Sequence, residues 1–192
     1  MKVYKFKCKD CGAKKYEKID NFDDILNSYN NLYERLYPLL ELYYNVITNE
    51  LPNLIRYLNA MNMIEYFSRE FDNDKATSLT IQDKPNKKNK GAEFVYRVKS
   101  LIQNVNEVFS FTSRDIDIIS EKVKAGRTYY VHYVENGKAL DYDELFDLYN
   151  FIEDIILLNV YKLVGLDISK YEYITYLDFF IVKEICYSLK NI

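Results

Sequence analysis

Apolar side chains recur at helical spacing over most of this chain. In one segment the steps between them alternate between four and three, at Phe94, Val98, Leu101, Val105 and Val108. This spacing is typical of the buried face of an amphipathic helix. Only three prolines and five glycines interrupt the chain, which favours long helices over a hairpin-rich sheet. We therefore expect an all-α helical bundle.

The clearest of these helices is predicted over about 143–164. Gly165 is a natural stop for it. Its apolar face consists of Leu145, Leu148, Ile152, Ile155, Ile156, Val160 and Leu163. A final helix is predicted over about 169–189. The pattern therefore places two helices in the last third of the chain.

The first part of the helical region is predicted to hold two helices or one divided helix. Asp20 or Asn21 can cap a helix that runs to about residue 36. Pro38 either interrupts this helix or begins another that runs to about residue 49, because proline cannot supply the N–H of a helix interior.

The next predicted helix, over about 52–71, has an acid on its apolar face. It begins at a proline, which suits a first helical turn. The apolar stripe is Leu54, Leu58 and Met61. The next step along that stripe is Glu65, so a carboxylate is expected beside the core.

A helix capped by Ser113 is predicted to bring an arginine toward the core. Its apolar stripe is Ile116, Ile119 and Val123, and the next step is Arg127. The only histidine of the chain, His132, follows five residues later.

These two side chains have the chemistry of metal-independent RNA cleavage. Near neutral pH, a histidine can accept a proton from a ribose hydroxyl and return it to a leaving oxygen. An arginine offers a planar set of donors to a phosphate whose charge rises in the transition state. DNA lacks the 2′-hydroxyl that such a reaction needs, so RNA is the expected substrate.

The spacing of this pair raises a geometric problem. On a continuous helix, positions five residues apart point roughly 140° away from each other. Two solutions remain open from the sequence. Either the helix ends between Arg127 and His132, with Gly126 loosening it, or the site is assembled from two copies of the chain across a two-fold axis.

Residues 1–20 differ in character from the rest of the chain. They are basic and alternate apolar with polar positions, which predicts a small knuckle or hairpin extension ahead of a helical domain over 21–192. Cys8 and Cys11 have the Cys-x2-Cys-Gly form of a zinc knuckle, but supply only half of a four-ligand site. Two chains could share one structural zinc, or the cysteines could be a degenerate knuckle without metal.

The balance of charge argues against recruitment of nucleic acid by the whole molecule. The 192 residues carry a formal net charge of −3. Lysines gather in 1–20 and in a predicted loop over 72–91, where they could contact phosphates nonspecifically. The chain has no apolar run long enough to span a membrane, no N-terminal signal and an odd number of cysteines, so we expect a cytoplasmic protein.

The Arg–His segment and its neighbours resemble the HEPN superfamily, specifically its Apea-like branch. The resemblance rests first on "ISEKVKAGRTYYVHY" followed by "ALDYDELFDLYNFIEDIILLNVYKLVGLD". The segments "LIRYLNAMNMIEYFSREF" and "EFVYRVKSLI" are similar to the two preceding helices of the family, and place Glu65 and Arg97 at matching positions. The similarity covers about residues 50–190.

The resemblance implies a helical bundle that forms a homodimer, with an RNA substrate and no cofactor for catalysis. It implies that Arg127 holds the scissile phosphate, His132 is the general acid and base, and Glu65 orients Arg127 or the substrate. Thr128, Tyr133 and Arg97 would contact the substrate, although Thr128 lacks the amide that the family usually has after the arginine.

The resemblance also suggests a biological setting. Many members are ribonucleases of antiphage defence, abortive infection or toxin–antitoxin systems, and an antitoxin or sensor is an expected partner. Other members bind RNA or a nucleotide without catalysis, or serve as dimerisation platforms, and this alternative stays open.

Overall fold

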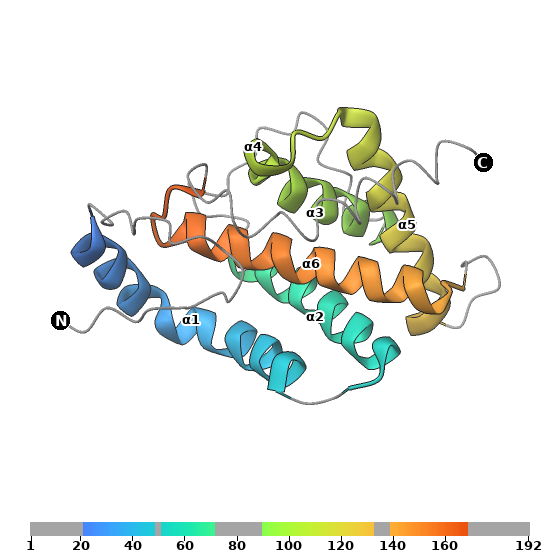
Figure 1. Cartoon of the computed structure of the whole chain (residues 1–192), viewed down its shortest axis with the longest axis horizontal. Helices are drawn as coiled ribbons and strands as arrows, with labels where there is room; N and C mark the ends of the chain where they lie inside the picture. Colours follow the sequence, from blue (N-terminus) through green and yellow to red (C-terminus); the bar gives the residue numbers. More distant parts are fainter. Residues whose placement is uncertain (1–20, 49–50, 72–89, 133–138, 169–192) are drawn as a thin grey trace, which may run out of the picture.

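Two long helices lie side by side through the centre of the molecule, and the others pack around them. The computed structural model describes residues 21–48, 51–71, 90–132 and 139–168. The helices are α1 (Phe22–Thr48), α2 (Asn53–Phe71), α3 (Lys90–Asn104), α4 (Asn106–Phe109), α5 (Ser113–His132) and α6 (Tyr142–Leu163). Figure 1 shows α6 along α2, with α1 on one side of this pair and α3 and α5 on the other. The predicted all-α bundle is confirmed, and the described residues include no strand.

Helix α6 agrees closely with its predicted range and face. All of its predicted apolar positions are buried except Leu163, which is half-buried. Asp141 caps its first turn by accepting from the backbone N–H of Glu144, whose side chain accepts from the N–H of Asp141 in return. Gly165, with φ of 90°, follows the helix in the left-handed conformation that glycine adopts at low cost.

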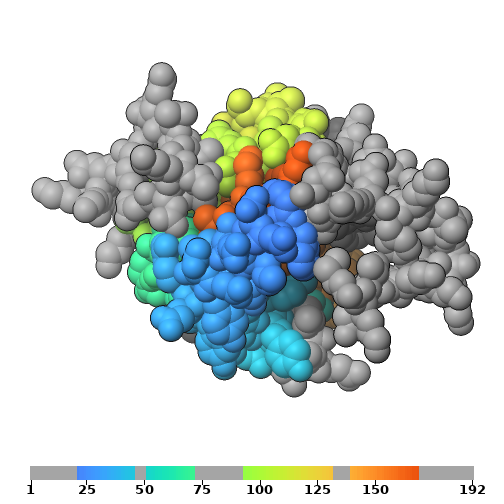
Figure 2. All heavy atoms as spheres, turned by 90° about the vertical axis from the view of Figure 1, so that its left-hand side faces the viewer, coloured from blue at the N-terminus to red at the C-terminus, as the bar shows by residue number. Residues whose placement is uncertain are grey.

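Helix α1 is one helix, so the predicted break at Pro38 is wrong. The proline lies inside the helix and removes one backbone hydrogen bond. Leu36 and Leu39 on either side of it are completely or almost completely buried. Packing against α2 therefore holds both halves in line. In Figure 2 the first turns of α1 lie beside the end of α6, where the side chain of Asn21 donates to the carbonyl of Gly165 at 3.4 Å.

The bounds predicted for α2 are correct within a residue, but its buried face is not the predicted one. Leu54 is 37% exposed and Leu58 is only half-buried. The buried face instead consists of Tyr57, Ala60, Met61, Met63, Ile64, Phe67, Ser68 and Phe71. This helix contacts α1, α6, α3 and α5, so its buried face is wider than a single stripe. Glu65 lies at the edge of that face.

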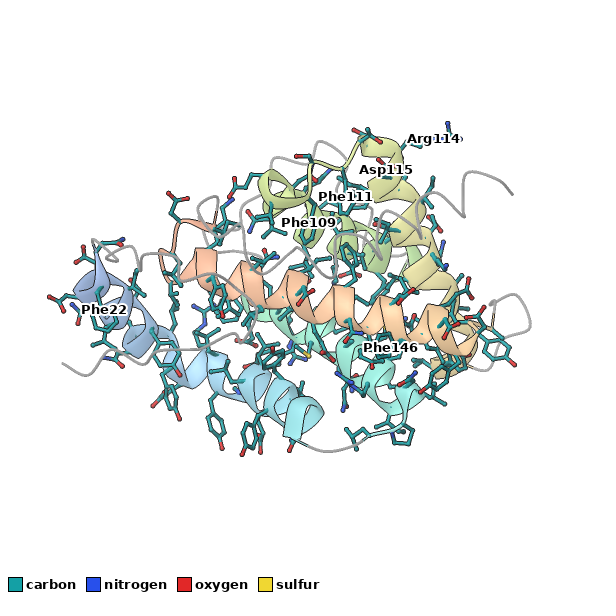
Figure 3. All side chains as sticks on the ribbon, viewed as in Figure 1. Phe22, Phe109, Phe111, Arg114, Asp115 and Phe146 are labelled. Atoms are coloured by element: carbon teal, nitrogen blue, oxygen red, sulfur yellow. The ribbon has the colours of Figure 1, made fainter. Side chains whose placement is uncertain are left out.

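The helix predicted around Phe94 to Val108 is divided in two. α3 ends at Asn104 and α4 follows as a short turn, after which Ser110 adopts a φ of 57°. The rings of Phe109 and Phe111 stack at 5.2 Å between centroids, and Figure 3 shows them at this connection. The side chain of Asn106 both accepts from and donates to the backbone of Phe111, which fixes the turn.

Helix α5 begins one residue earlier than a cap at Ser113 would place it. Thr112, rather than Ser113, is the capping residue, because its hydroxyl accepts from the backbone N–H of Asp115 and its own N–H donates to the carboxylate of Asp115. Ser113 is already helical.

Several predicted features lie outside the described residues. These are the 1–20 extension with Cys8 and Cys11, most of the 72–91 loop, and the helix over 169–189. The last two residues of that predicted loop are helical, because α3 begins at Lys90. None of the described helices combines the length and apolarity that crossing a membrane would require.

Candidate functional site

Helix α5 carries both Arg127 and His132 without interruption. It runs from Ser113 to His132, so the predicted helix end between the two residues is wrong. Gly126 does not loosen the helix, since it is helical and buried. The positions of Arg127 and His132 therefore point roughly 140° apart around one helix axis. The structure thus excludes the first of the two solutions that the sequence left open, and assembly from two chains stays a prediction.

The guanidinium of Arg127 is held by residues from two other helices. Its Nη2 donates to Oε1 of Glu65 on α2, and the two groups form an ion pair. Its Cζ lies 4.5 Å from the ring centroid of Phe94 on α3, within the range of a cation–π contact. The side chains of Arg127 and Glu65 are 21% and 42% exposed, so solvent reaches both. The arrangement orients a charged fork of donors at the edge of the bundle.

Glu65 thus contacts Arg127 directly, and its expected role in orienting Arg127 or the substrate stays a prediction. The sequence placed both residues on inward-facing positions of separate helices, but could not show that they meet. Phe94 was recognised only as a core residue. A buried aromatic ring and a ring beneath an arginine have the same sequence pattern, so no signal distinguished them.

The remaining predicted site residues are distributed around this pair. Arg97 lies on α3, one turn beyond Phe94, and donates to the carboxylate of Glu93 at 2.7 Å. Thr128 lies on α5 next to Arg127 and is half-buried. The structure describes the backbone of His132, which closes α5, but not its side chain, and Tyr133 lies outside the described residues. The substrate roles of these residues stay predictions.

A second polar cluster, which the sequence did not reveal, lies between α2 and α6. The guanidinium of Arg56 lies 4.0 Å from the ring centroid of Tyr149 and donates to the Tyr149 hydroxyl at 2.8 Å. It also donates to Oε2 of Glu153 at 3.4 Å. Glu153 stands between Ile152 and Ile155 on α6, and an acid among these apolar positions was the signal available in the sequence.

The carboxyl of Glu153 lies in a strongly desolvating environment. Glu153 is only 6% exposed, and within the described residues its Oε1 has no hydrogen-bond partner. Burial raises its pKa from the usual 4.5 to about 7. The charge and the hydrogen bond of Arg56 act in the opposite direction but are the smaller effects. The same cluster affects Tyr43 on α1, whose pKa is raised by burial and then by the charges of Glu153 and Asp154. This cluster is therefore a buried, titratable contact and is separate from the Arg127 pair.

The structure offers no metal centre within 21–48, 51–71, 90–132 and 139–168. In these ranges no three His, Cys, Asp or Glu side chains come together in a way that could hold a metal ion. Cys8 and Cys11 lie outside them, so the shared zinc site stays a prediction.

Comparison with known protein families gives a match to this chain. The family model described as Apea-like HEPN matches residues 58–170, a range that contains Glu65, Arg97, Arg127 and His132. No curated protein and no solved structure matches the chain significantly.

Proposed function

This chain belongs to the Apea-like HEPN family, whose model covers more than half of it, and from that premise we propose that it is a metal-independent endoribonuclease acting as a homodimer. The observation that carries the proposal is the placement of Arg127. Its guanidinium is held between Glu65 and Phe94 on a helix whose last residue is the only histidine of the chain.

In the proposed reaction, His132 transfers the protons and Arg127 stabilises the phosphate. The imidazole removes the proton of a ribose 2′-hydroxyl, and the resulting oxygen attacks the adjacent phosphorus. The bond from phosphorus to the 5′-oxygen breaks, and that oxygen takes the proton back from the protonated imidazole of His132. The products are a 2′,3′-cyclic phosphate and a 5′-hydroxyl end. The guanidinium of Arg127 donates to the phosphate oxygens, whose negative charge rises during the attack.

The continuity of α5 supports a site shared between two protomers. Because Arg127 and His132 point roughly 140° apart on one helix, Arg127 of one protomer would act with His132 of the partner subunit. Thr128 lies between these two directions, at about 100° from Arg127, and is placed to contact a substrate that bridges them. Arg97 and Tyr133 would add further contacts to the RNA.

Glu65 is proposed to orient Arg127 before the substrate arrives. A carboxylate paired with the guanidinium restricts its rotamers, so less side-chain entropy is lost when a phosphate binds. The family further suggests a defence or toxin setting with an antitoxin or sensor as partner, and this belongs to the proposal.

Incubation of labelled RNA with excess chelator tests the proposed chemistry. We expect cleavage by the wild type, and loss of at least 100-fold in Arg127→Ala and His132→Ala, as for other removed electrostatic and acid–base groups. Arg114→Ala is the matched control, because Arg114 is an exposed arginine at the other end of α5. An RNA whose 2′-hydroxyl at the cut position is replaced by hydrogen should not be cleaved.

Mixing two inactive variants tests the shared site. If Arg127 acts with the partner's His132, a heterodimer of Arg127→Ala and His132→Ala chains contains one intact site. Random reassociation of equal amounts would then restore about a quarter of the wild-type sites. No restoration, with dimers demonstrated by mass, would place both residues of a site in one chain. Absence of cleavage by the wild type would instead favour a module that binds RNA without cutting it.

A further inference from the structure

Tyr57 reaches from α2 into the backbone of α5 next to Arg127. Its side chain is completely buried, and its hydroxyl donates to the carbonyl of Val123 at 2.9 Å. In an α-helix, the carbonyl of Val123 also accepts the N–H of Arg127, four residues later. The hydroxyl therefore bonds to the same carbonyl as the backbone of Arg127.

Gly126 makes this approach possible. A Cβ atom at this position would lie 2.6 Å from the Tyr57 hydroxyl oxygen and 2.6 Å from Cδ1 of Leu140. Both distances are far inside van der Waals contact. Glycine inside a helix costs about 1 kcal/mol relative to alanine, so its presence here needs a compensating reason. The close contact with Tyr57 and Leu140 supplies one.

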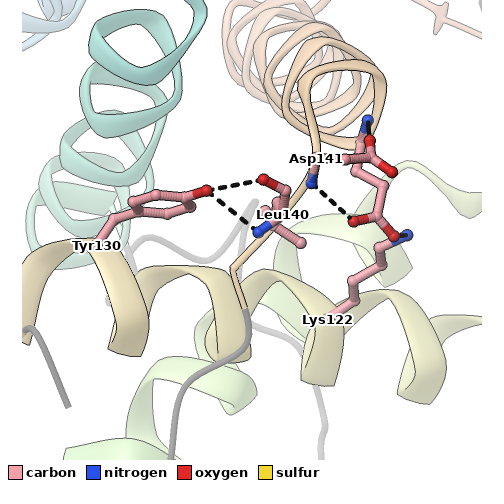
Figure 4. A network of polar contacts seen from close by, with 5 residues as sticks. Lys122, Tyr130, Leu140 and Asp141 are labelled. Carbon is pink, nitrogen blue, oxygen red and sulfur yellow. Dashed lines mark hydrogen bonds and ion pairs between the residues drawn. The ribbon is translucent and has the colours of Figure 1, made fainter. Parts of the chain in front are cut away.

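Tyr130 holds the same turn of α5 from another direction. Its ring packs edge-on against that of Tyr57, with centroids 6.1 Å apart. Its hydroxyl donates to the carbonyl of Leu140 at 2.8 Å and accepts from the N–H of Leu140 at 3.1 Å (Figure 4). Leu140 precedes Asp141, which caps α6. The end of α5 is thus attached to α2 through Tyr57 and to the start of α6 through Tyr130.

The hydroxyl of Tyr57 stays a hydrogen-bond donor at any physiological pH. Burial raises its pKa, the neighbouring Tyr130 raises it further, and Arg127 acts in the opposite direction. A protonated hydroxyl beside a backbone carbonyl keeps its bond, and breaking that bond would leave a buried polar group unsatisfied.

We propose that Tyr57 is a positioning residue for Arg127, and that Gly126 is a glycine so that the Tyr57 hydroxyl can reach the backbone of α5. Tyr57 and Glu65 both belong to α2, so one helix fixes the backbone of Arg127 and also its guanidinium. This inference rests on the proposed ribonuclease function. A displacement of about 1 Å at a catalytic group can cost about 100-fold in rate, so a contact that sets the rotation of α5 affects catalysis without touching the substrate.

Removal of the Tyr57 hydroxyl tests the proposal. Tyr57→Phe keeps the ring and removes the hydroxyl. Tyr66→Phe is the matched control, because Tyr66 is also on α2 and donates to a backbone carbonyl, that of Arg35, at 2.8 Å. We expect Tyr57→Phe to lower kcat about tenfold with KM little changed, and Tyr66→Phe to leave kcat as in the wild type. Equal kcat in both variants would overturn the proposal.

The role of Gly126 is tested by coupling. Gly126→Ala should lower kcat, and part of this loss should be recovered in the double variant with Tyr57→Phe, which lacks the oxygen that the new Cβ meets. Full additivity of the two changes would show that Gly126 does not serve the Tyr57 hydroxyl.

A spectroscopic measurement separates failure of this inference from failure of the proposed function. The side-chain Nε–H resonance of Arg127 can be recorded in the absence of RNA. We expect it to move in Tyr57→Phe and to stay in place in Tyr66→Phe, whether or not the protein cleaves RNA. An unmoved resonance in both variants would overturn the positioning role, whereas a moved resonance in a protein without activity would contradict only the ribonuclease.

Discussion

Replacement of Glu153 by glutamine should make the protein more stable at neutral and alkaline pH. The carboxyl lies between α2 and α6 with only 6% of the residue exposed, and burial raises its pKa from 4.5 to about 7. Ionisation is therefore harder in the folded than in the unfolded chain. The folded state keeps a proton that the unfolded state releases between these two pH values, so stability falls as pH rises through this window.

The magnitude follows from the width of the window. A rise of the Glu153 pKa from 4.5 to about 7 lowers the free energy of unfolding by about 3 kcal/mol once the pH exceeds 7, relative to its value at acid pH. Glutamine resembles the protonated carboxyl in shape and does not ionise. The free energy of unfolding of Glu153→Gln should therefore match that of the wild type near pH 4.5 and exceed it by about 3 kcal/mol at pH 8.

Urea unfolding followed by helical circular dichroism at several pH values measures this difference. Glu121→Gln is the matched control, because that side chain is 57% exposed and pairs with Lys124 on the surface of α5. Its difference from the wild type should be small and nearly independent of pH. If the difference in free energy of unfolding between Glu153→Gln and the wild type is also constant between pH 5 and 8, the reasoning is refuted. Arg56 would then compensate fully for the desolvation of the ionised carboxylate.

Three further substitutions test the contacts that define the fold. Asp141→Ala removes the cap of α6 and should cost about 1 kcal/mol in urea unfolding, whereas Asp143→Ala, two residues on, should cost less. Gly165→Ala should cost about 1 kcal/mol through backbone strain alone, because φ is 90° and no atom lies within 4 Å of the added Cβ; an unchanged stability would contradict this. Asn159→Ala should cost about 2 to 3 kcal/mol, because its buried amide donates to two backbone carbonyls, and a loss below 1 kcal/mol would show that water replaces it.

The helices were largely predictable, because their signals are local. The apolar spacing around Ile152 and the stop at Gly165 are set by residues within a few positions of one another, and α6 follows them. The cap at Asp141 is equally local, but it was not identified from the sequence. The errors arose where tertiary contacts outweigh a local preference. Pro38 breaks a helix in isolation, but Leu36 and Leu39 bury against α2 on both sides of it, and α1 continues.

The candidate site was predictable only in its parts. The pattern marked Arg127 as an inward position and Glu65 as an acid on an apolar face, since both properties can be seen from spacing alone. The pattern did not show that these two side chains meet, or that Phe94 lies beneath the guanidinium. Such contacts depend on the angle at which helices cross, which no single helix contains.

The sequence by itself determined the helical class, the approximate extent of α2 and α6, the approximate start of α5, and a single Arg–His pair with roughly 140° between its positions on a continuous helix. The tertiary structure decided that α5 continues through Gly126 to His132. The physical reason is that a glycine at this place in the sequence is compatible with two structures. It can loosen a helix, or it can allow another group to lie against the helix backbone. Only the buried Tyr57 hydroxyl and Leu140, brought there by α2 and by the start of α6, make it a point of close contact.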